Sequence, residues 1–447
     1  MTVNLAPAYV RKVGAGFDLA IALGILAADD QIPAERLRAC AVFGELSLGG
    51  GLRPGRGALA IAEGAARAGI ATLIVPAENA EEAGLVPDID VRAAGSLGAV
   101  AALLRGEEID YEAEPAVPAA PDPVAEPLDL SDVRGHAGPI RALTIAAAGG
   151  HNLLMSGPPG TGKTMLARRL PSILPAMTQD EAIEVTRIHS VAGLRSGGGL
   201  ARERPFRAPH HTISPSGLVG GGAVPTPGEA SLAHNGVLFL DELSEFPRNA
   251  LEALRQPLED GRVVVVRKQQ AAIYPTRFVL AAATNPCPCG HAGTTRCRCT
   301  DADHQRHRRR LSGPLLDRID LLVDVQRPAA SELRAGPVAR SAELRDAVEA
   351  ARERQRSRLR GTVARCNAEM SPMLVREHVA LDEAGERLLR KAYEAGRLSA
   401  RGHHRVLKVA RTIADLASSE SVGVDDVRVA LGWRLDVEGS DDASAVA

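Results

Sequence analysis

The sequence predicts an α/β fold with a parallel sheet, preceded by a smaller mixed domain and followed by a helical domain. Five short apolar runs alternate with helical patterns, which is typical of strands in a buried parallel sheet. These runs are 152–155, 237–240, 263–266, 278–283 and 320–325. A stretch of proline, alanine and acidic residues at 111–127 is typical of a semi-extended linker. After residue 341 only helical patterns follow, at 341–360, 381–394, 402–417 and 424–431.

These patterns divide the 447 residues into five consecutive segments. We expect a first α+β domain over 1–110, the linker 111–127, the α/β core over 128–335, a helical domain over 336–437 and a tail over 438–447. In the first domain, apolar runs at 2–5, 41–43 and 71–75 alternate with helical patterns at 17–28, 58–68 and 96–105. A chain of this length can bury several hydrophobic cores.

A glycine-rich segment follows the first run of the core and precedes a helical pattern. Its residues are Gly157, Pro158, Pro159, Gly160, Thr161, Gly162, Lys163 and Thr164. Glycines at a strand-to-helix turn let backbone N–H groups surround phosphates, and a helix N-terminus favours negative charge. We expect Lys163 to reach the β- and γ-phosphates, and Thr164 to offer its hydroxyl to Mg²⁺. The segment therefore predicts a site for a nucleoside triphosphate such as ATP.

Two further strand ends carry polar residues that complete such a site. Asp241 and Glu242 follow the run 237–240 directly. The first carboxylate can hold Mg²⁺ through water, and the second can orient or deprotonate the attacking water. The run 278–283 leads to Asn285, whose amide can sense the γ-phosphate, although asparagine is also an ordinary turn residue.

Six motifs outside the glycine-rich segment narrow the assignment. They are DVRG at 132–135, RPFRAPHH at 204–211, PGE at 227–229, GVLFLDEL at 236–243, NPCPCG at 285–290 and SGPLLDRID at 312–320. Their order resembles that of AAA+ ATPases, and within these the magnesium-chelatase-like YifB/ComM group. The likeness covers almost the whole chain, so it implies an AAA+ P-loop NTPase module with a helical lid.

The resemblance implies roles that spacing alone does not indicate. Asn285 would be the first sensor of the γ-phosphate, Arg318 a finger pointed at a neighbouring subunit's ATP, and Arg401 the second sensor at the start of a lid helix. An arginine suits these roles because its planar cation neutralises charge spread over phosphoryl oxygens. Without the family, exposed surface arginines would be the better interpretation. A finger given to a neighbour requires a head-to-tail ring, so the resemblance implies a homo-hexamer.

Two insertions are candidate contacts to nucleic acid. Residues 262–274 predict a hairpin with a basic tip, and in the resembling family this hairpin faces the ring pore. Arg267 and Lys268 at the tip are therefore candidates for gripping a DNA backbone, with a solvated turn as the alternative. Residues 210–222, rich in glycine and serine, would also project toward the pore. The basic run 306–310 serves either nucleic acid or a subunit interface.

Four of the six cysteines form a C-x-C, seven-residue, C-x-C arrangement. They are Cys287, Cys289, Cys297 and Cys299. Soft ligands this close suit a tetrahedral Zn²⁺ site, in which His291 or His304 can replace a thiol. The ion would be structural and would pin the loop that follows the sensor strand. The one-residue spacing is tighter than in most zinc knuckles, so free or redox-sensitive thiols remain the alternative.

Residues 2–105 resemble the Lon-protease-like domain of the same family. The residues that carry this likeness are KVGAGFDL at 12–19, GELSL at 44–48 and LIVPAEN at 73–79. A Lon-type peptidase needs a serine nucleophile and a lysine base, and those positions fall on Gly16 and Leu59. We therefore expect a binding or assembly role and no peptidase activity. The likeness begins in mid-domain, so we expect either a misassigned start or a truncated domain with an unpaired edge strand.

The composition limits the remaining function classes. The formal net charge is −2, so affinity for nucleic acid must come from local basic patches. Aromatic residues make up 2% of the chain, which disfavours binding of single strands by base stacking. The longest apolar stretch, 19–28, is about half of what a bilayer span needs, so we expect a cytoplasmic protein with no membrane partner.

Taken together, these expectations describe an ATP-hydrolysing ring motor that acts on branched or single-stranded DNA, in branch migration or unwinding. One alternative is the ATPase subunit of a magnesium-chelatase-type complex. Another is a general protein-remodelling ATPase. The Lon-like domain and the cysteine group favour the motor, because magnesium-chelatase subunits look different at both places.

Overall fold

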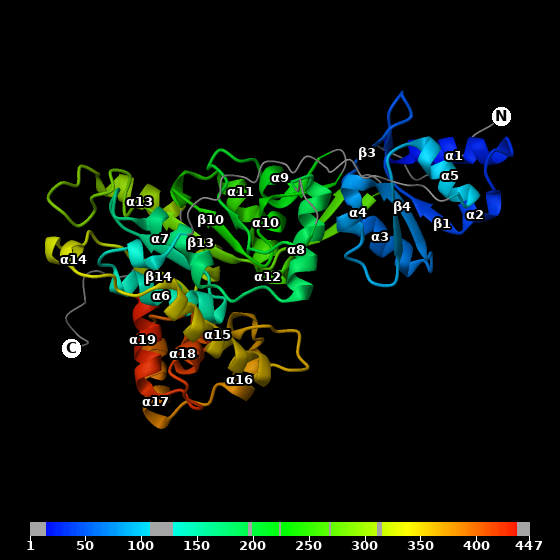
Figure 1. Ribbon diagram of the computed structural model, residues 1–447. Helices are drawn as coiled ribbons and strands as arrows, with labels where there is room; N and C mark the ends of the chain where they lie inside the picture. Colours follow the sequence, from blue (N-terminus) through cyan, green and yellow to red (C-terminus); the bar gives the residue numbers. More distant parts are fainter. Residues whose placement is uncertain are drawn as a thin grey trace.

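A five-stranded parallel sheet forms the centre of the molecule (Figure 1). The computed structural model describes residues 15–107, 128–194, 199–222, 225–267, 270–310 and 315–435. The expected strand 2–5, the linker 111–127, Lys268 and the tail 438–447 lie outside these residues. The sheet order is β14 (Leu321–Asp324), β6 (Leu153–Ser156), β13 (Val279–Thr284), β10 (Val237–Leu240) and β7 (Phe206–Arg207). All carboxyl ends lie at one edge, where ligands of open parallel sheets bind.

Four of the five predicted runs form strands of this sheet, and the run 263–266 does not. It lies in β11 (Arg262–Arg267), which pairs antiparallel with β12 (Gln270–Pro275), in agreement with the hairpin expected over 262–274. Its side chains alternate: Val263 and Val265 are each 5% exposed, whereas Val266 is 60% exposed. A strand inside the central sheet is buried on both faces, as all four residues of β10 are. The fifth place in the sheet belongs to the two-residue β7.

Helices cover both faces of the sheet and continue into the lid. Leu153 and Met155 belong to one core, which also contains residues of α6 (Ala137–Gly149) and of the lid helices, whereas Leu154 faces a second core. β6 is therefore apolar at successive positions. The other helices of this part are α7 (Lys163–Arg169), α8 (Gln179–Ala192), α9 (Pro215–Val219), α10 (Glu229–Leu232), α11 (Arg248–Ala253), α12 (Arg255–Asp260), α13 (Asp301–Arg310) and α14 (Ala330–Arg334).

The lid consists of α15 (Ser341–Arg358), α16 (Pro372–His378), α17 (Glu383–Glu394), α18 (Ala400–Leu416) and α19 (Val424–Leu435). It lies against one side of the sheet, below it in Figure 1. α18 is its central helix: Ser399 caps it by accepting a hydrogen bond from Gly402 N, and ten of its residues are buried. A buried polar network holds it in place, since Asp415 accepts hydrogen bonds from Asn367 (2.8 Å) and Arg358.

The first domain contains a three-stranded parallel sheet in the order β1 (Cys40–Val42), β4 (Thr72–Pro76) and β5 (Asp90–Ala94). Its helices are α1 (Asp18–Ala28), α2 (Ala34–Arg38), α3 (Ala58–Arg67), α4 (Ala77–Ala83) and α5 (Leu97–Arg105). An antiparallel ribbon of β2 (Glu45–Leu46) and β3 (Leu52–Arg53) also belongs to this domain. In the central module, a second short antiparallel ribbon is formed by β8 (Gly220–Gly221) and β9 (Thr226–Pro227).

The first domain packs on α8 of the central module through α3 (Figure 1). Gly57 N donates to Ser190 Oγ at 3.0 Å, and this hydroxyl donates in turn to Glu82. Arg187 on α8 forms an ion pair with Glu63 on α3 at 3.0 Å. Helix α8 is therefore shared between the two domains.

Candidate functional site

The glycine-rich loop 157–162 connects the end of β6 to the start of α7, at the carboxyl edge of the sheet. Gly160 (φ 76°) and Gly162 (φ 90°) have left-handed backbone conformations, which glycine adopts without strain. A Cβ atom on Gly157 would lie 2.2 Å from the carbonyl oxygen of Val325. Three of the loop's glycines are therefore required by its shape.

Lys163 is a buried cation at the base of this loop. Its Nζ donates to the carbonyl oxygens of Gly157 (2.6 Å) and Pro158 (2.9 Å) and to Asn285 Oδ1 (3.3 Å). Burial lowers the pKa of Lys163, while the nearby charge of Asp241 acts in the opposite direction. Within the described residues it forms no ion pair, so the loop holds a positive charge that fits an anionic ligand such as a triphosphate.

Thr164 and Asp241 lie next to each other, as expected for partners of one Mg²⁺ ion. Thr164 Oγ1 donates to Asp241 Oδ2 at 2.6 Å, although the two residues are far apart in the chain. The other carboxylate oxygen, Oδ1, accepts from Glu242 N at 2.9 Å. Hydroxyl and carboxylate oxygens are the ligands that Mg²⁺ prefers, so the pair fits this ion.

Glu242 has an unusual backbone conformation at the end of β10. Its φ is 52°, a left-handed value that is uncommon for residues other than glycine and occurs preferentially at functional sites. Its side chain is exposed, and Oε2 lies 3.4 Å from His211 Nδ1. His211 belongs to the insertion 210–222, so this insertion contacts the carboxylate expected to activate water. The structure thus brings Lys163, Thr164, Asp241, Glu242 and Asn285 to one edge of the sheet.

Arg318 and Arg401 lie at the opposite edge of the sheet from their own glycine-rich loop. Arg318 precedes β14, and its carbonyl oxygen accepts from Asn152 Nδ2 at 3.0 Å, where Asn152 precedes β6. Its guanidinium is 5% exposed and forms an ion pair with Glu259. Burial lowers the pKa of Arg318, and the charges of neighbouring arginines, among them Arg401, add to this effect.

Arg401 is exposed at the start of α18. Its Nη1 lies 3.7 Å from Asp317 Oδ2, one residue before Arg318. The structure therefore brings the two arginines together, and it brings neither of them to the glycine-rich loop of the same chain.

The neighbouring Asp320 is buried. Burial alone would raise its pKa, but the charge of Arg405 and the hydrogen bond from His151 outweigh burial and lower it.

The four cysteines converge after β13. The Sγ atoms of Cys287, Cys289 and Cys297 are separated by 3.4 Å (287 to 289), 3.9 Å (287 to 297) and 3.7 Å (289 to 297). Cys299 is the fourth member of the group, and all four Sγ atoms lie within 4.8 Å of one another. His304 is adjacent, with Nε2 3.5 Å from Cys297 Sγ. The basic run 306–310 lies on α13, and His307 Nε2 donates to the carbonyl oxygen of Asn285 at 2.8 Å.

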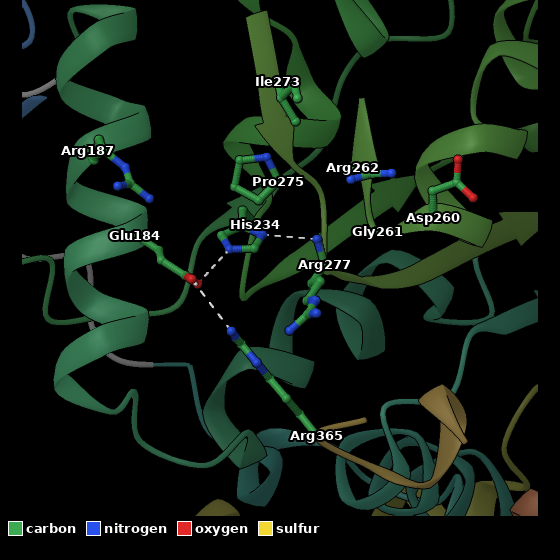
Figure 2. Close-up of a pocket in the computed structure, with 10 residues that line it drawn as sticks. All are labelled: Glu184, Arg187, His234, Asp260, Gly261, Arg262, Ile273, Pro275, Arg277 and Arg365. Carbon is green, nitrogen blue, oxygen red and sulfur yellow. Dashed lines mark hydrogen bonds and ion pairs between the residues drawn. The ribbon is translucent and has the colours of Figure 1, made fainter. Parts of the chain in front are cut away.

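A basic cavity that the sequence analysis missed lies at the base of the β11–β12 hairpin (Figure 2). It has a volume of about 560 Å³ and is lined by Glu184, Arg187, His234, Asp260, Gly261, Arg262, Ile273, Pro275, Arg277 and Arg365. Arginines at both ends of the predicted hairpin were the available signal. Arg365 comes from the lid and could not have been placed there from the sequence. Arg267 ends β11 at the tip, but its side chain and Lys268 lie outside the described residues.

One carboxylate and one neutral histidine order the wall of this cavity. Glu184 accepts hydrogen bonds from His234 Nε2 (2.9 Å) and Asn235 (3.0 Å), which lower the pKa of Glu184 to about 2. Burial lowers the pKa of His234, and its Nδ1 accepts a hydrogen bond from Arg277 N at 3.0 Å. The neutral ring therefore connects the Glu184 carboxylate to the backbone of Arg277. Arg262 and Arg277 have no ion pair among the described residues, which leaves the cavity positively charged.

Three family models match the chain. The model described as "Magnesium chelatase, subunit ChlI" matches residues 129–333, its C-terminal counterpart matches 338–434, and "Subunit ChlI of Mg-chelatase" matches 1–79. Among the described residues, no helix is both long enough and apolar enough to cross a membrane.

The chain is also similar to curated proteins over most of its length. It is 44% identical to competence protein ComM of Haemophilus influenzae, over 97% of this chain and 85% of that protein. Protein YifB of Escherichia coli is 42% identical, with the same shares covered. The magnesium-chelatase 38 kDa subunit of Acidiphilium rubrum is 27% identical over 65% of this chain and 84% of that protein.

Proposed function

Because the chain belongs to the magnesium-chelatase-like AAA+ ATPases of the YifB and ComM group, we propose that it is an ATP-driven ring motor that acts on DNA. The observation that carries this proposal is the division of the ATP-site residues between the two edges of one sheet. A single protomer then holds one half of each of two sites, and a head-to-tail ring completes them.

The half of the site at the carboxyl edge binds ATP and activates water. The loop amides and Lys163 hold the phosphates. Thr164 and Asp241 would hold Mg²⁺, which when bound neutralises charge on the β- and γ-phosphates. Glu242 takes the proton of the attacking water, and its exposed side chain is accessible for this role. Asn285 positions that water beside the γ-phosphate, because its amide already reaches Lys163.

The half at the amino edge serves the neighbouring protomer. Arg318 stabilises the charge that develops on the neighbour's transferring phosphoryl group. Arg401 lies beside it, so we propose that the second sensor also acts on the neighbour's ATP. In the free protomer Glu259 holds Arg318 by an ion pair, and we propose that assembly replaces this partner with the γ-phosphate. This arrangement favours a closed head-to-tail ring, and from the family resemblance we propose that the ring is a homo-hexamer.

Three observations support DNA as the substrate of the motor. The β11–β12 hairpin is a ribbon separate from the central sheet with Val266 and Ile273 exposed, and its base borders a cavity with four arginines (Figure 2). Phosphate groups of a nucleic-acid backbone are the anions that such a surface attracts. The similarity to competence protein ComM, at 44% identity, exceeds that to the magnesium-chelatase subunit, at 27%. We therefore prefer a motor on branched or single-stranded DNA in the cytoplasm over a chelatase subunit or a protein-remodelling ATPase.

ATP turnover measured with and without DNA tests this proposal. We expect branched or single-stranded DNA to stimulate turnover of the wild-type chain. Arg277→Glu should weaken DNA binding and reduce its salt dependence by about one phosphate contact. Arg387→Glu, on the exposed face of α17, is the matched control and should bind DNA normally. If no DNA binds at low salt and none changes turnover, the proposal of a DNA motor is wrong. The chelatase subunit and the protein-remodelling ATPase are then the favoured functions.

We propose Zn²⁺ as a further, structural cofactor at the four cysteines. The support is the convergence of four sulfur atoms within 4.8 Å, which matches a closed tetrahedral site. His304 lies beside these sulfurs and is available as a neighbouring hydrogen-bond partner.

A further inference from the structure

We propose that the Zn²⁺ site controls ATP turnover, because the loop that carries it supports both the glycine-rich loop and Asn285. This inference rests on the proposed Zn²⁺ cofactor and adds a dependence of catalysis on an ion that does not touch the nucleotide. It concerns residues 286–307, which comprise the loop that joins the first sensor to α13 and the first part of that helix.

The sulfur positions leave room for one ion and little else. In a regular tetrahedron with Zn–S bonds of about 2.3 Å, neighbouring sulfurs are about 3.8 Å apart. The three separations among Cys287, Cys289 and Cys297 are 3.4, 3.7 and 3.9 Å, and Cys299 lies within 4.8 Å of them. The cysteines therefore hold a nearly complete ligand geometry without a large movement of the chain.

The loop has few other interactions that could order it. From 288 to 300, Gly290 is the only buried residue, and Cys287 precedes it. A segment of this length with so few buried residues does not repay the entropy of ordering, and metal ligation is a common substitute for a core. Most of the order of this segment therefore depends on the thiols.

The cysteine loop contacts the ATP site at two places, and the first of these is the glycine-rich loop. Gly290 has φ 79°, and its N donates to the carbonyl oxygen of Cys287 at 2.9 Å, which closes a tight turn. A Cβ atom on Gly290 would lie 2.4 Å from Pro159 Cδ and 2.8 Å from Pro159 Cγ. The turn between the two cysteine pairs thus packs directly against the loop that holds the phosphates.

The second contact is with the sensor itself. Cys287 follows Asn285 by two residues, and Cys297 and Cys299 lead directly into α13. From α13, His307 Nε2 donates to the carbonyl oxygen of Asn285 at 2.8 Å. The ion therefore closes a ring of contacts from Asn285 through the cysteines and α13 back to Asn285. Without it, the residues on both sides of the sensor lose their shared anchor.

The experiment measures zinc content, ATP affinity and turnover on the same preparations of the full chain. We expect about one Zn²⁺ per chain in protein purified without added zinc. A zinc-selective chelator, with Mg²⁺ kept in excess, should lower turnover about 10- to 100-fold, since small misplacements of catalytic groups have effects of this size. Added Zn²⁺ should restore turnover, which separates the effect from unfolding.

Three variants make the test specific. Cys297→Ser should lose zinc and turnover together, whereas Cys40→Ser, a cysteine of the first domain, is the matched control and should retain both. Gly290→Ala should also lower turnover, because its Cβ would displace Pro159 and an alanine is strained at φ 79°. Less than half an equivalent of zinc would overturn the metal site itself. Full zinc with turnover unchanged on its removal would overturn only its control of the ATP site.

Discussion

Arg318→Ala tests whether each ATP site is shared between two protomers. The carbonyl oxygen of Arg318 contacts Asn152, and Gly157 follows five residues later along β6. A strand rises about 3.3 Å per residue, so Asn152, beside the Arg318 carbonyl, and Gly157 of the phosphate-binding loop are separated by about 16 Å. An arginine side chain extends about 7 Å from its Cα atom. Arg318 therefore cannot reach ATP bound to its own chain.

Loss of this side chain should act on turnover and leave ATP binding intact. We expect kcat to fall about 1,000-fold or more, which is the usual contribution of an arginine finger. The Kd for ATP should change by no more than a few fold. Removal of the Arg318 side chain leaves Glu259 without this partner, and the Glu259 side chain is 51% exposed and can be hydrated, so the variant should fold. Lys163→Ala, in contrast, should abolish ATP binding.

Mixing the two variants gives the decisive assay. In a randomly mixed ring, about a quarter of the interfaces combine an intact glycine-rich loop from one chain with an intact Arg318 from the other. The mixture should therefore recover turnover that neither variant has alone, measured as phosphate release at equal total protein. If both variants enter the same rings and the mixture stays inactive, the shared site is refuted.

Three further predictions concern single side chains. Glu242→Gln should lower kcat about 100- to 10,000-fold while ATP stays bound, as measured by retention of labelled ATP on a filter; normal turnover would remove Glu242 from catalysis. Asp320→Ala should lower the free energy of unfolding by about 3–5 kcal/mol in urea titrations, since it leaves Arg405 without its buried partner; a loss below about 1 kcal/mol would contradict this. The pKa of Glu184 is lowered to about 2, so its ionised form stabilises the fold above pH 4.5, and this contribution, on the order of 3 kcal/mol, disappears as the pH falls toward 2. Tm measured against pH should therefore fall less steeply below pH 4.5 in Glu184→Gln than in the wild type; identical slopes would contradict the assignment.

The sequence was sufficient for the part of the site that depends on local order. The glycine-rich loop, Asp241 and Glu242 each follow a strand directly, and the ends of parallel strands meet at one edge. Strand β7 could not be predicted, because a strand of two residues has no periodic pattern of apolar side chains. The run 263–266 was assigned to the central sheet as well as to a hairpin, since apolar β-branched residues suit both and only the burial pattern separates them.

Residues that meet across long distances in the chain were not predictable from one sequence. The basic cavity combines α8, the ends of a hairpin and Arg365 of the lid, and no spacing rule connects these segments. The ion pair of Arg318 with Glu259 and the contact of Gly290 with Pro159 are of the same kind. Tertiary packing decides such contacts, and a motif records only the residues that take part.

The hydrogen bonds that join Ser190 of α8 to Gly57 and Glu82 have a consequence for how the chain unfolds. Separating the first domain would exchange these buried hydrogen bonds for bonds to water, at a net cost of about 0.5–1.5 kcal/mol for each bond. The two domains should therefore melt in one cooperative transition. A protease site inserted within 111–127 should yield two fragments that remain associated through gel filtration and separate only in denaturant.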